Sequence, residues 1–289
     1  MNLLIVIYIV IFSLLFSLVV LWLTTIGYII KDKKREKQYL RLEQGIIESL
    51  AYSFIDDSID KTENIKKLKA YIKDNDISFW DSVNVFMKVN RFIKFSNNEN
   101  LKFIFNSLGL EKVLKEKITT NDWYVKAKAI WMTYEFGISD NTKLIIPYRN
   151  DDITLIRRES QIALVTFLGW KSLILLPYFT KTMSLWQQIR IIEKLHETEE
   201  KLDIYHFEKA LKSENIIVKE LLVRIIKSFK LHEYKYYVVK QLYSKNSNLI
   251  KVAVEALNEL TPESIELKQI EKRLPNIQRE LVRNYLHVS

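Results

Sequence analysis

The sequence predicts an all-α protein in which a membrane-spanning N-terminal helix precedes a series of helix pairs. An uncharged apolar stretch occupies residues 3–30, and one apolar pattern recurs at nearly regular intervals after residue 121. Glycine and proline are also scarce, with 5 and 4 copies in 289 residues. All-β folds need turn residues about every 8–12 positions, so this scarcity favours helices joined by short polar links.

The first element is the apolar stretch, which runs for 28 residues without a charge. A helix needs about 20 apolar residues to cross a bilayer. Trp22 and Tyr28 lie near its C-terminal end, where aromatic rings favour the headgroup zone. A cleaved signal peptide is the alternative, but it has a basic start, a shorter apolar run and a small-residue cleavage site. We therefore expect residues 1–30 to form a retained transmembrane anchor.

A basic cluster follows the apolar stretch directly. Its bases are Lys31, Lys33, Lys34, Arg35 and Lys37, with Arg41 close behind. The positive-inside rule then predicts a single-pass protein of the cytoplasmic (inner) membrane, with its N-terminus outside and its C-terminal domain in the cytoplasm. We expect the cluster to face anionic lipid headgroups. A nucleic-acid or nuclear-localisation patch is the alternative interpretation of the same residues.

Two poorly patterned regions come next: a basic juxtamembrane helix and linker over residues 31–60, then degenerate helical pairs over 61–120. Four helices are expected there, with Ser78 capping the third, Asn98 capping the fourth, and the "LGL" of 108–110 breaking the fourth. Their expected ranges are 38–56, 62–75, 77–95 and 99–117.

From residue 121 to 289 an apolar anchor recurs at spacings of 31, 33, 29, 31 and 28 residues. The anchors are Val125, Ile156, Ile189, Val218, Leu249 and Ile277. Apolar positions follow at i+4, i+7 and i+8, which lie on one face of a helix. A second apolar stretch follows in each unit, so two helices per unit, repeated, predict a helical solenoid. "IIPY" and "LLPY" place Pro147 and Pro177 at matching points near the second helix of consecutive units.

The unit "NSNLIKVAVEALNEL" resembles the first helix of a HEAT repeat, and "NDWYVKAKAIWM" and "DDITLIRRESQIAL" are weaker copies. The resemblance covers residues 121–289. It implies a right-handed α-solenoid of HEAT-like helix pairs and, because such proteins are more often scaffolds than enzymes, an interaction function.

The sequence contains no recognised catalytic motif. The five glycines are scattered, there is no cysteine, and the four histidines do not pair at helical spacings. We expect no catalytic residues, no metal and no cofactor, and hence no enzyme. A deep pocket that gathered carboxylates or histidines would instead support an enzyme function. The acid pair Asp151–Asp152 precedes a helix, and Asp152 is predicted to cap it. The bases that follow the anchors, Lys126, Arg157, Arg190 and Lys219, are predicted to pair with acids of neighbouring units.

The sequence thus predicts a membrane-anchored cytoplasmic scaffold that binds a protein partner in a membrane-associated complex, such as a glycosyltransferase or a secretion machine. No small-molecule substrate is evident. The candidate contact residues lie on the predicted second helices: Tyr148, Arg149, Tyr178, Lys181, Tyr237 and Lys240. The alternative is a membrane-tethered solenoid that binds nucleic acid, which the net charge of +9 motivates. A basic track on the concave face would favour nucleic acid, whereas an apolar patch with a polar rim would favour protein.

Overall fold

The structure, a computed structural model, describes residues 3–55, 61–93, 99–198, 200–260 and 264–286. These residues form α-helices and short 3-10 helices, with no β-strand among them, so the predicted all-α class is confirmed. The chain divides into two compact units, Met1–Leu114 and Lys115–Ser289. The division falls inside helix α5 (Leu110–Ile118).

The first unit is built on one long helix, α1, which runs from Leu3 to Ile55 without a break. The other helices of this unit are α2 (Lys61–Asp74), α3 (Phe79–Ile93) and α4 (Glu99–Ser107). The expectation of a separate helix beginning at residue 38 is therefore wrong. The segment after residue 30 is rich in Lys, Arg, Glu and Gln, which are good helix formers, so the backbone continues from the apolar stretch into the polar one.

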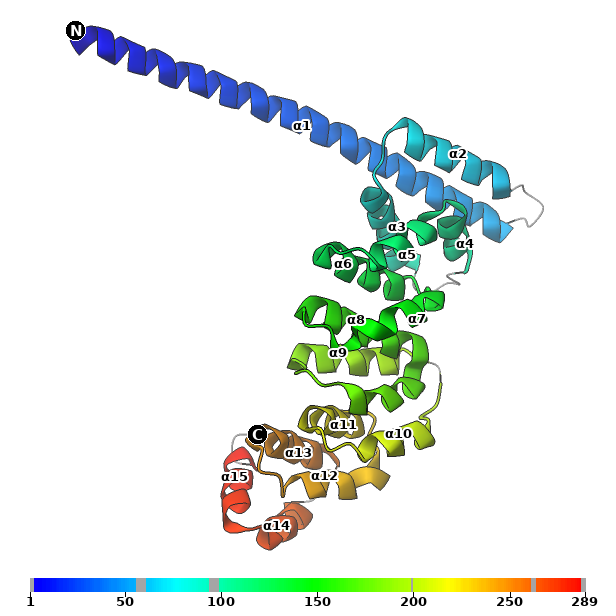
Figure 1. The fold of residues 1–289 in the computed structure, drawn as a ribbon, viewed down its shortest axis with the longest axis vertical. Coiled ribbons are helices and arrows are strands. Elements are labelled where there is room, and N and C mark those ends of the chain that lie inside the picture. Colours follow the sequence, from blue (N-terminus) through cyan, green and yellow to red (C-terminus); the bar gives the residue numbers. More distant parts are fainter. Residues whose placement is uncertain (1–2, 56–60, 94–98, 199, 261–263, 287–289) are drawn as a thin grey trace. The chain divides into compact units, whose positions relative to one another are not determined.

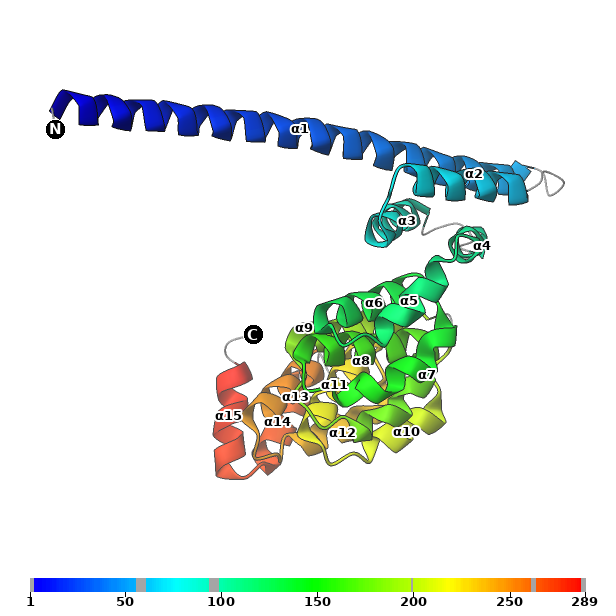
Figure 2. The ribbon, with the colours of Figure 1, turned by 45° about the horizontal axis from the view of Figure 1, so that its top comes forward.

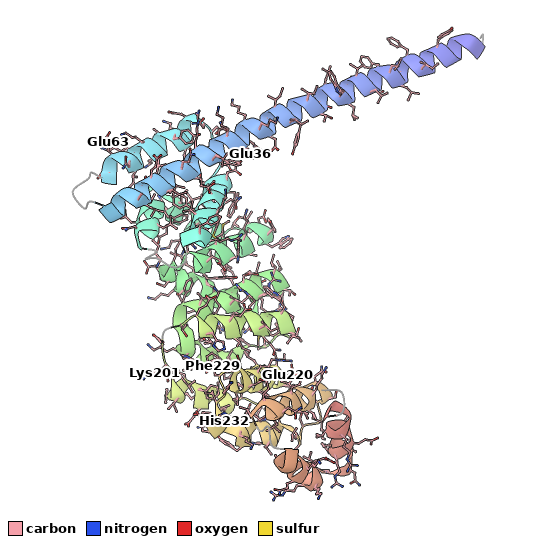
Figure 3. The ribbon with its side chains drawn as sticks, turned by 180° about the vertical axis from the view of Figure 1, so that it is seen from behind. Glu36, Glu63, Lys201, Glu220, Phe229 and His232 are labelled. Carbon is pink, nitrogen blue, oxygen red and sulfur yellow. The ribbon has the colours of Figure 1, made fainter. Side chains whose placement is uncertain are left out.

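The two halves of α1 differ in their surroundings. From residue 11 to 30 nearly every side chain is exposed, as at Phe12 (73%) and Trp22 (63%), whereas Leu42, Ile46 and Leu50 are buried. Figure 1 shows α2, α3 and α4 gathered along the C-terminal half of α1, and Figure 3 shows the N-terminal side chains projecting with nothing packed on them. By length and composition this helix can cross a membrane. The segment Thr154–Tyr178 also passes that test, but it is mostly buried inside the second unit.

Helices α2 and α3 pack on the C-terminal half of α1. The Tyr71 hydroxyl donates to the carbonyl of Gln38 at 3.2 Å, which ties the end of α2 to α1. Lys88 of α3 pairs with Glu43 at 2.6 Å. Figure 2 shows α2 lying alongside α1. Ser78 Oγ accepts the amide of Asp81 at 3.2 Å, so the predicted cap of α3 is confirmed. The predicted cap at Asn98 lies outside the described residues.

The second unit covers the part of the chain for which repeats are predicted. Its elements are α6 (Trp123–Glu135), η1 (Ser139–Asn141), α7 (Thr142–Ile145), η2 (Ile146–Asn150), α8 (Thr154–Leu168), η3 (Gly169–Tyr178), α9 (Leu185–His196), α10 (Ile204–Leu211), α11 (Ile216–Ser228), η4 (His232–Tyr234), α12 (Lys235–Gln241), α13 (Ser247–Leu260), α14 (Ser264–Arg273) and α15 (Asn276–Leu286). In the chain order of the predicted first helices, α6 packs on α8, α8 on α9, α9 on α11, α11 on α13 and α13 on α15. Within this unit, Figure 1 shows α6, α8 and α9 stacked in that order, with α7 and α10 to one side.

In the first two predicted repeats, the segment expected to form the second helix is largely 3-10 helix rather than α-helix. Pro147 lies in the first turn of η2, where a missing amide hydrogen costs little, and Pro177 lies in the last turn of η3. The two segments are joined by Asn150, whose Nδ2 donates to the Tyr178 carbonyl at 2.8 Å and whose Oδ1 accepts the Thr180 amide at 3.0 Å. The matching "IIPY" and "LLPY" motifs therefore belong to two neighbouring segments that are hydrogen-bonded to each other.

The predicted anchors are not all interior. Ile156, Val218 and Leu249 are buried, but Ile189 is 44% exposed and Ile277 is 74% exposed. In α9 the buried positions include Gln187 and Gln188. Gln187 donates to the Gln161 side chain, and Gln188 accepts from Nε of Arg224 at 3.0 Å. Because hydrogen bonds satisfy these buried amides, the interior face of α9 differs from the one that its apolar pattern predicts.

Candidate functional site

A groove of 660 Å³ is lined by α6, by the N-terminal half of α8 and by α9. All three helices belong to the second unit. The lining residues are Tyr124, Ala127, Lys128, Trp131, Tyr134, Leu155, Arg158, Glu159, Trp186, Arg190 and Glu193. The volume lies in the range of about 300–1,000 Å³ that is typical of ligand sites. The groove is the strongest candidate binding site in the described part of the chain.

Helix capping positions one end of the groove. Asp122 Oδ1 accepts the amides of Tyr124 and Val125 at 2.9 and 3.1 Å, and Ser184 Oγ accepts that of Gln187 at 3.2 Å. These caps satisfy the first free amides of α6 and α9 and fix where each helix begins. The second residue of each groove helix then lines the groove, namely Tyr124, Leu155 and Trp186.

Aromatic side chains form much of the groove surface. Tyr124 is 56% exposed and Trp186 is 51% exposed, while Trp131 on α6 is half-buried. The guanidinium of Arg158 lies 4.8 Å from the centre of the Trp186 ring, a cation–π distance. Leu185 and Ile189 are exposed on the same helix as Trp186, so α9 presents further apolar surface beside the groove.

A buried carboxylate joins the first two groove helices. Glu159 Oε2 accepts the Tyr134 hydroxyl at 2.8 Å, and its Oε1 accepts Nε of Arg158 at 2.8 Å. Nη2 of Arg158 lies 2.7 Å from the same oxygen. Burial and then the neighbouring Glu159 charge raise the pKa of the Tyr134 phenol, so the phenol remains a donor. This arrangement holds α6 against α8 and fixes the Arg158 side chain.

A second charged cluster joins α9 to α6. Nη1 of Arg190 donates to Glu193 at 2.8 Å within α9, and its Nη2 lies 3.5 Å from Glu135 of α6. The lining therefore carries three cations, Lys128, Arg158 and Arg190, of which the two arginines are paired with carboxylates. No group of three or more histidine and acidic side chains able to hold a metal ion occurs among the described residues.

The structure gives other partners to most of the bases that were predicted to pair with acids of neighbouring repeats. Of the four bases after the anchors, Arg190 reaches an acid of a different predicted repeat, Glu135, but that repeat is two positions away rather than adjacent. Arg157 is buried and donates to the carbonyl of Asp151 at 2.6 Å, Lys219 pairs with Glu214 at 2.6 Å, and Lys126 lies 4.5 Å from the Tyr148 ring. The prediction for those three is wrong, because nearer acceptors and a nearer ring exist within reach of each side chain.

The predicted cap at Asp152 is also wrong. Asp151 Oδ1 accepts the amide of Ile153 at 2.8 Å, whereas the Asp152 carboxylate is exposed and pairs with Lys181 at 3.0 Å. The two acids differ by one residue, and only Asp151 lies where the chain turns into α8. Hydrogen-bond geometry, rather than the presence of an acid pair, decides which of the two carboxylates binds the backbone amide before α8.

The six predicted partner-contact residues lie outside the groove lining. Tyr178, Lys181 and Lys240 are exposed, Tyr148 and Arg149 are half-buried, and Tyr237 is buried. Nη1 of Arg149 donates to the Ile146 carbonyl at 2.9 Å. The bases of the α1 cluster, Lys31, Lys33, Lys34, Arg35 and Lys37, are all exposed.

Sequence reasoning did not identify the groove residues as a site. The sequence does contain one pattern that points to them, because an aromatic residue follows a capping residue by two positions at both Tyr124 and Trp186. Trp123 and Trp186 are both about half exposed. No sequence pattern shows that Glu159 meets Tyr134, because 25 residues separate them.

No family model matches this chain, and comparison with the curated proteins finds no match.

Proposed function

We propose that this chain is a single-pass membrane protein whose HEAT-like helical repeats form a right-handed α-solenoid and bind a protein partner on the cytoplasmic side. The observation that carries the proposal is the groove of α6, α8 and α9. Its surface is aromatic and its arginines are paired with carboxylates, so its surface suits protein better than phosphate.

The anchor is supported by the N-terminal half of α1. Its apolar side chains are exposed along the whole stretch from residue 11 to 30, and burying them requires a bilayer or another helix. The exposed bases that follow favour a cytoplasmic location for the rest of the chain. Such a topology suits a partner that is itself associated with the membrane, as in a glycosyltransferase or secretion complex.

The repeat assignment is supported by the order of packing in the second unit. Each predicted first helix contacts the next first helix in the chain, which is the nearest-neighbour arrangement of a helical solenoid. Side-chain links follow the same order, with Gln188 bonded to Arg224 and Lys227 paired with Glu259 at 2.7 Å.

Site-specific photocrosslinking in cells tests the binding function. A photoreactive amino acid replaces Ile189 beside the groove and, as the control, Tyr236, which is 65% exposed on α12. We expect one protein to crosslink from position 189 and not from position 236. Equal labelling from both positions, or crosslinks from 189 to nucleic acid, would contradict the proposal.

The absence of cysteine in the chain makes the topology easy to test. In the Lys201→Cys variant the new thiol replaces an exposed side chain of the second unit. Figure 3 labels this residue. We expect an impermeant maleimide to label it only after the cytoplasmic membrane is permeabilised, and the protein to stay in the membrane fraction at high pH. Labelling of intact cells would overturn the proposed orientation.

A further inference from the structure

The groove has two kinds of surface, and together they limit what it can bind. Its apolar part consists of Tyr124, Trp131, Leu155 and Trp186, which come from three helices. Its charged part consists of the pairs Arg158–Glu159 and Arg190–Glu193, with Lys128 beside them. Bulky apolar side chains of a ligand can pack against the apolar part. The charged part selects ligands according to their charge.

The charged part is nearly neutral. The lining holds Lys128, Arg158 and Arg190 against Glu159 and Glu193, and Glu135 lies 3.5 Å from Arg190 just outside it. Glu159 is buried and accepts hydrogen bonds from Tyr134 and Arg158, so its negative charge compensates the positive charge of Arg158. A phosphate chain would lie beside carboxylates, and a strongly basic segment would lie beside three cations. Charge complementarity therefore favours an uncharged segment.

Arg158 still offers hydrogen-bond donors. Nε and Nη2 are directed to Glu159 and one face of the guanidinium lies over Trp186, whereas Nη1 donates to no group among the described residues. The Glu159 contacts hold this side chain in place, so the free edge is positioned before a ligand arrives. A main-chain carbonyl is a neutral acceptor that suits such an edge.

We propose that the groove binds an uncharged, extended peptide segment of the partner protein, in which bulky apolar side chains pack against Trp131 and Trp186 and a main-chain carbonyl accepts from Arg158. The inference rests on the proposed function and specifies the chemistry of its ligand. Trp186 is the anchor because it is exposed and its ring is oriented by Arg158.

The test uses the full-length protein in lipid nanodiscs and a phage-displayed library of random peptides about twelve residues long. The affinity of a selected peptide, labelled with fluorescein, is then measured by anisotropy. We expect selection of peptides that have at least two bulky apolar side chains and no net charge. Selection of strongly acidic or basic peptides, or of none, would overturn the inference.

Trp186→Ala and Trp123→Ala form a matched pair of variants. Both tryptophans are about half exposed, and Trp123 lies next to Tyr124 but outside the groove lining. We expect Trp186→Ala to weaken peptide binding at least about tenfold and Trp123→Ala to leave it within about twofold. Equal effects would overturn the inference. Because Trp186 is exposed, the fold should tolerate its removal, and circular dichroism checks this.

Arg158→Lys is the second variant, and it keeps the positive charge while it removes the guanidinium edge. We expect weaker peptide binding with an unchanged circular dichroism spectrum. Binding of a thymidine oligonucleotide of about twenty nucleotides that is lost in Trp186→Ala would favour nucleic acid and overturn the inference. Protein crosslinks from position 189 without any groove-dependent peptide binding would overturn this inference alone, and the proposed partner function would stand.

Discussion

The hydroxyl of Tyr134 on α6 donates a 2.8 Å hydrogen bond to Oε2 of Glu159 on α8, and both side chains are buried. The same carboxylate holds Arg158, whose guanidinium lies over Trp186 of α9. One buried acid therefore connects three consecutive first helices and sets the shape of the groove between them.

Loss of this hydrogen bond should destabilise the second unit. Tyr134→Phe keeps the ring but leaves Oε2 of Glu159 without its donor, and an unsatisfied buried acceptor costs about 1–3 kcal/mol. We expect the free energy of unfolding to fall by about that amount in urea titrations followed by circular dichroism. Tyr124→Phe is the control, because Tyr124 is 56% exposed, and it should change little. A Tyr134→Phe protein as stable as the control would show that the hydrogen bond makes no net contribution to the free energy of unfolding.

Alkaline pH should destabilise the protein in a way that depends on Tyr134. Burial, then the Glu159 charge, raises the pKa of Tyr134, and burial also raises that of Tyr237. The unfolded chain releases these protons near pH 10, whereas the folded chain retains them. Stability is therefore complete below about pH 10 and falls as the pH rises above it.

Denaturant titrations at several pH values above neutrality measure this effect, and absorbance at 295 nm follows tyrosinate formation. We expect Tyr134→Phe to lose stability less steeply above about pH 10 than the unmodified protein. Identical slopes for the two proteins would show that Tyr134 titrates normally.

The basic cluster on α1 should bind anionic membranes electrostatically. In a fragment that begins at Lys31, Lys31, Lys33, Lys34 and Lys37 are replaced by Gln. We expect weaker binding to vesicles that contain anionic phospholipid, by up to roughly 1 kcal/mol per base, and a smaller dependence on salt.

The matched control replaces Lys66, Lys67, Lys69 and Lys73 of α2, which are also exposed and carry the same total charge. Vesicle sedimentation compares the two variants. An equal loss in both would mean that only net charge matters and that the cluster has no special role.

Gly169, between α8 and η3, should not tolerate a side chain. Its φ of +50° and ψ of −134° are accessible essentially to glycine alone, and a Cβ there would lie 3.2 Å from Cγ2 of Thr198. We expect Gly169→Ala to lower the free energy of unfolding by about 1–3 kcal/mol. Gly27→Ala is the control, because nothing lies within 4 Å of its Cβ position. A thermal scan in which both variants melt alike would rule out backbone strain at residue 169.

Much of the fold could be predicted from local patterns. The break at Gly109 and the cap at Ser78 agree with the structure. Helix caps and periodicity depend on residues a few positions apart, so they can be identified in the sequence itself. The prediction of a separate helix that begins at residue 38 was wrong, because no cap or breaker interrupts α1 between its apolar and polar halves.

The candidate site could not be predicted in the same way. Ile189 was expected inside and is exposed beside the groove, while Gln187 and Gln188 take the buried positions of α9. Those amides are tolerated there because Gln161 and Arg224, from other helices, bond to them. Burial of a polar side chain depends on partners distant in sequence, which an apolar pattern does not include.

The sequence by itself determined the all-α class, the apolar N-terminal helix with its basic flank, and the cap at Ser78, because these follow from interactions within a few residues. Only the tertiary structure decided that Tyr134 meets Glu159 and that Arg158 lies over Trp186. Packing of α6, α8 and α9 brings together residues up to 69 positions apart along the groove, Tyr124 and Glu193. Buried Glu159 needs hydrogen-bond donors, and tertiary packing supplies one of them, the Tyr134 hydroxyl of α6, which no local pattern reveals.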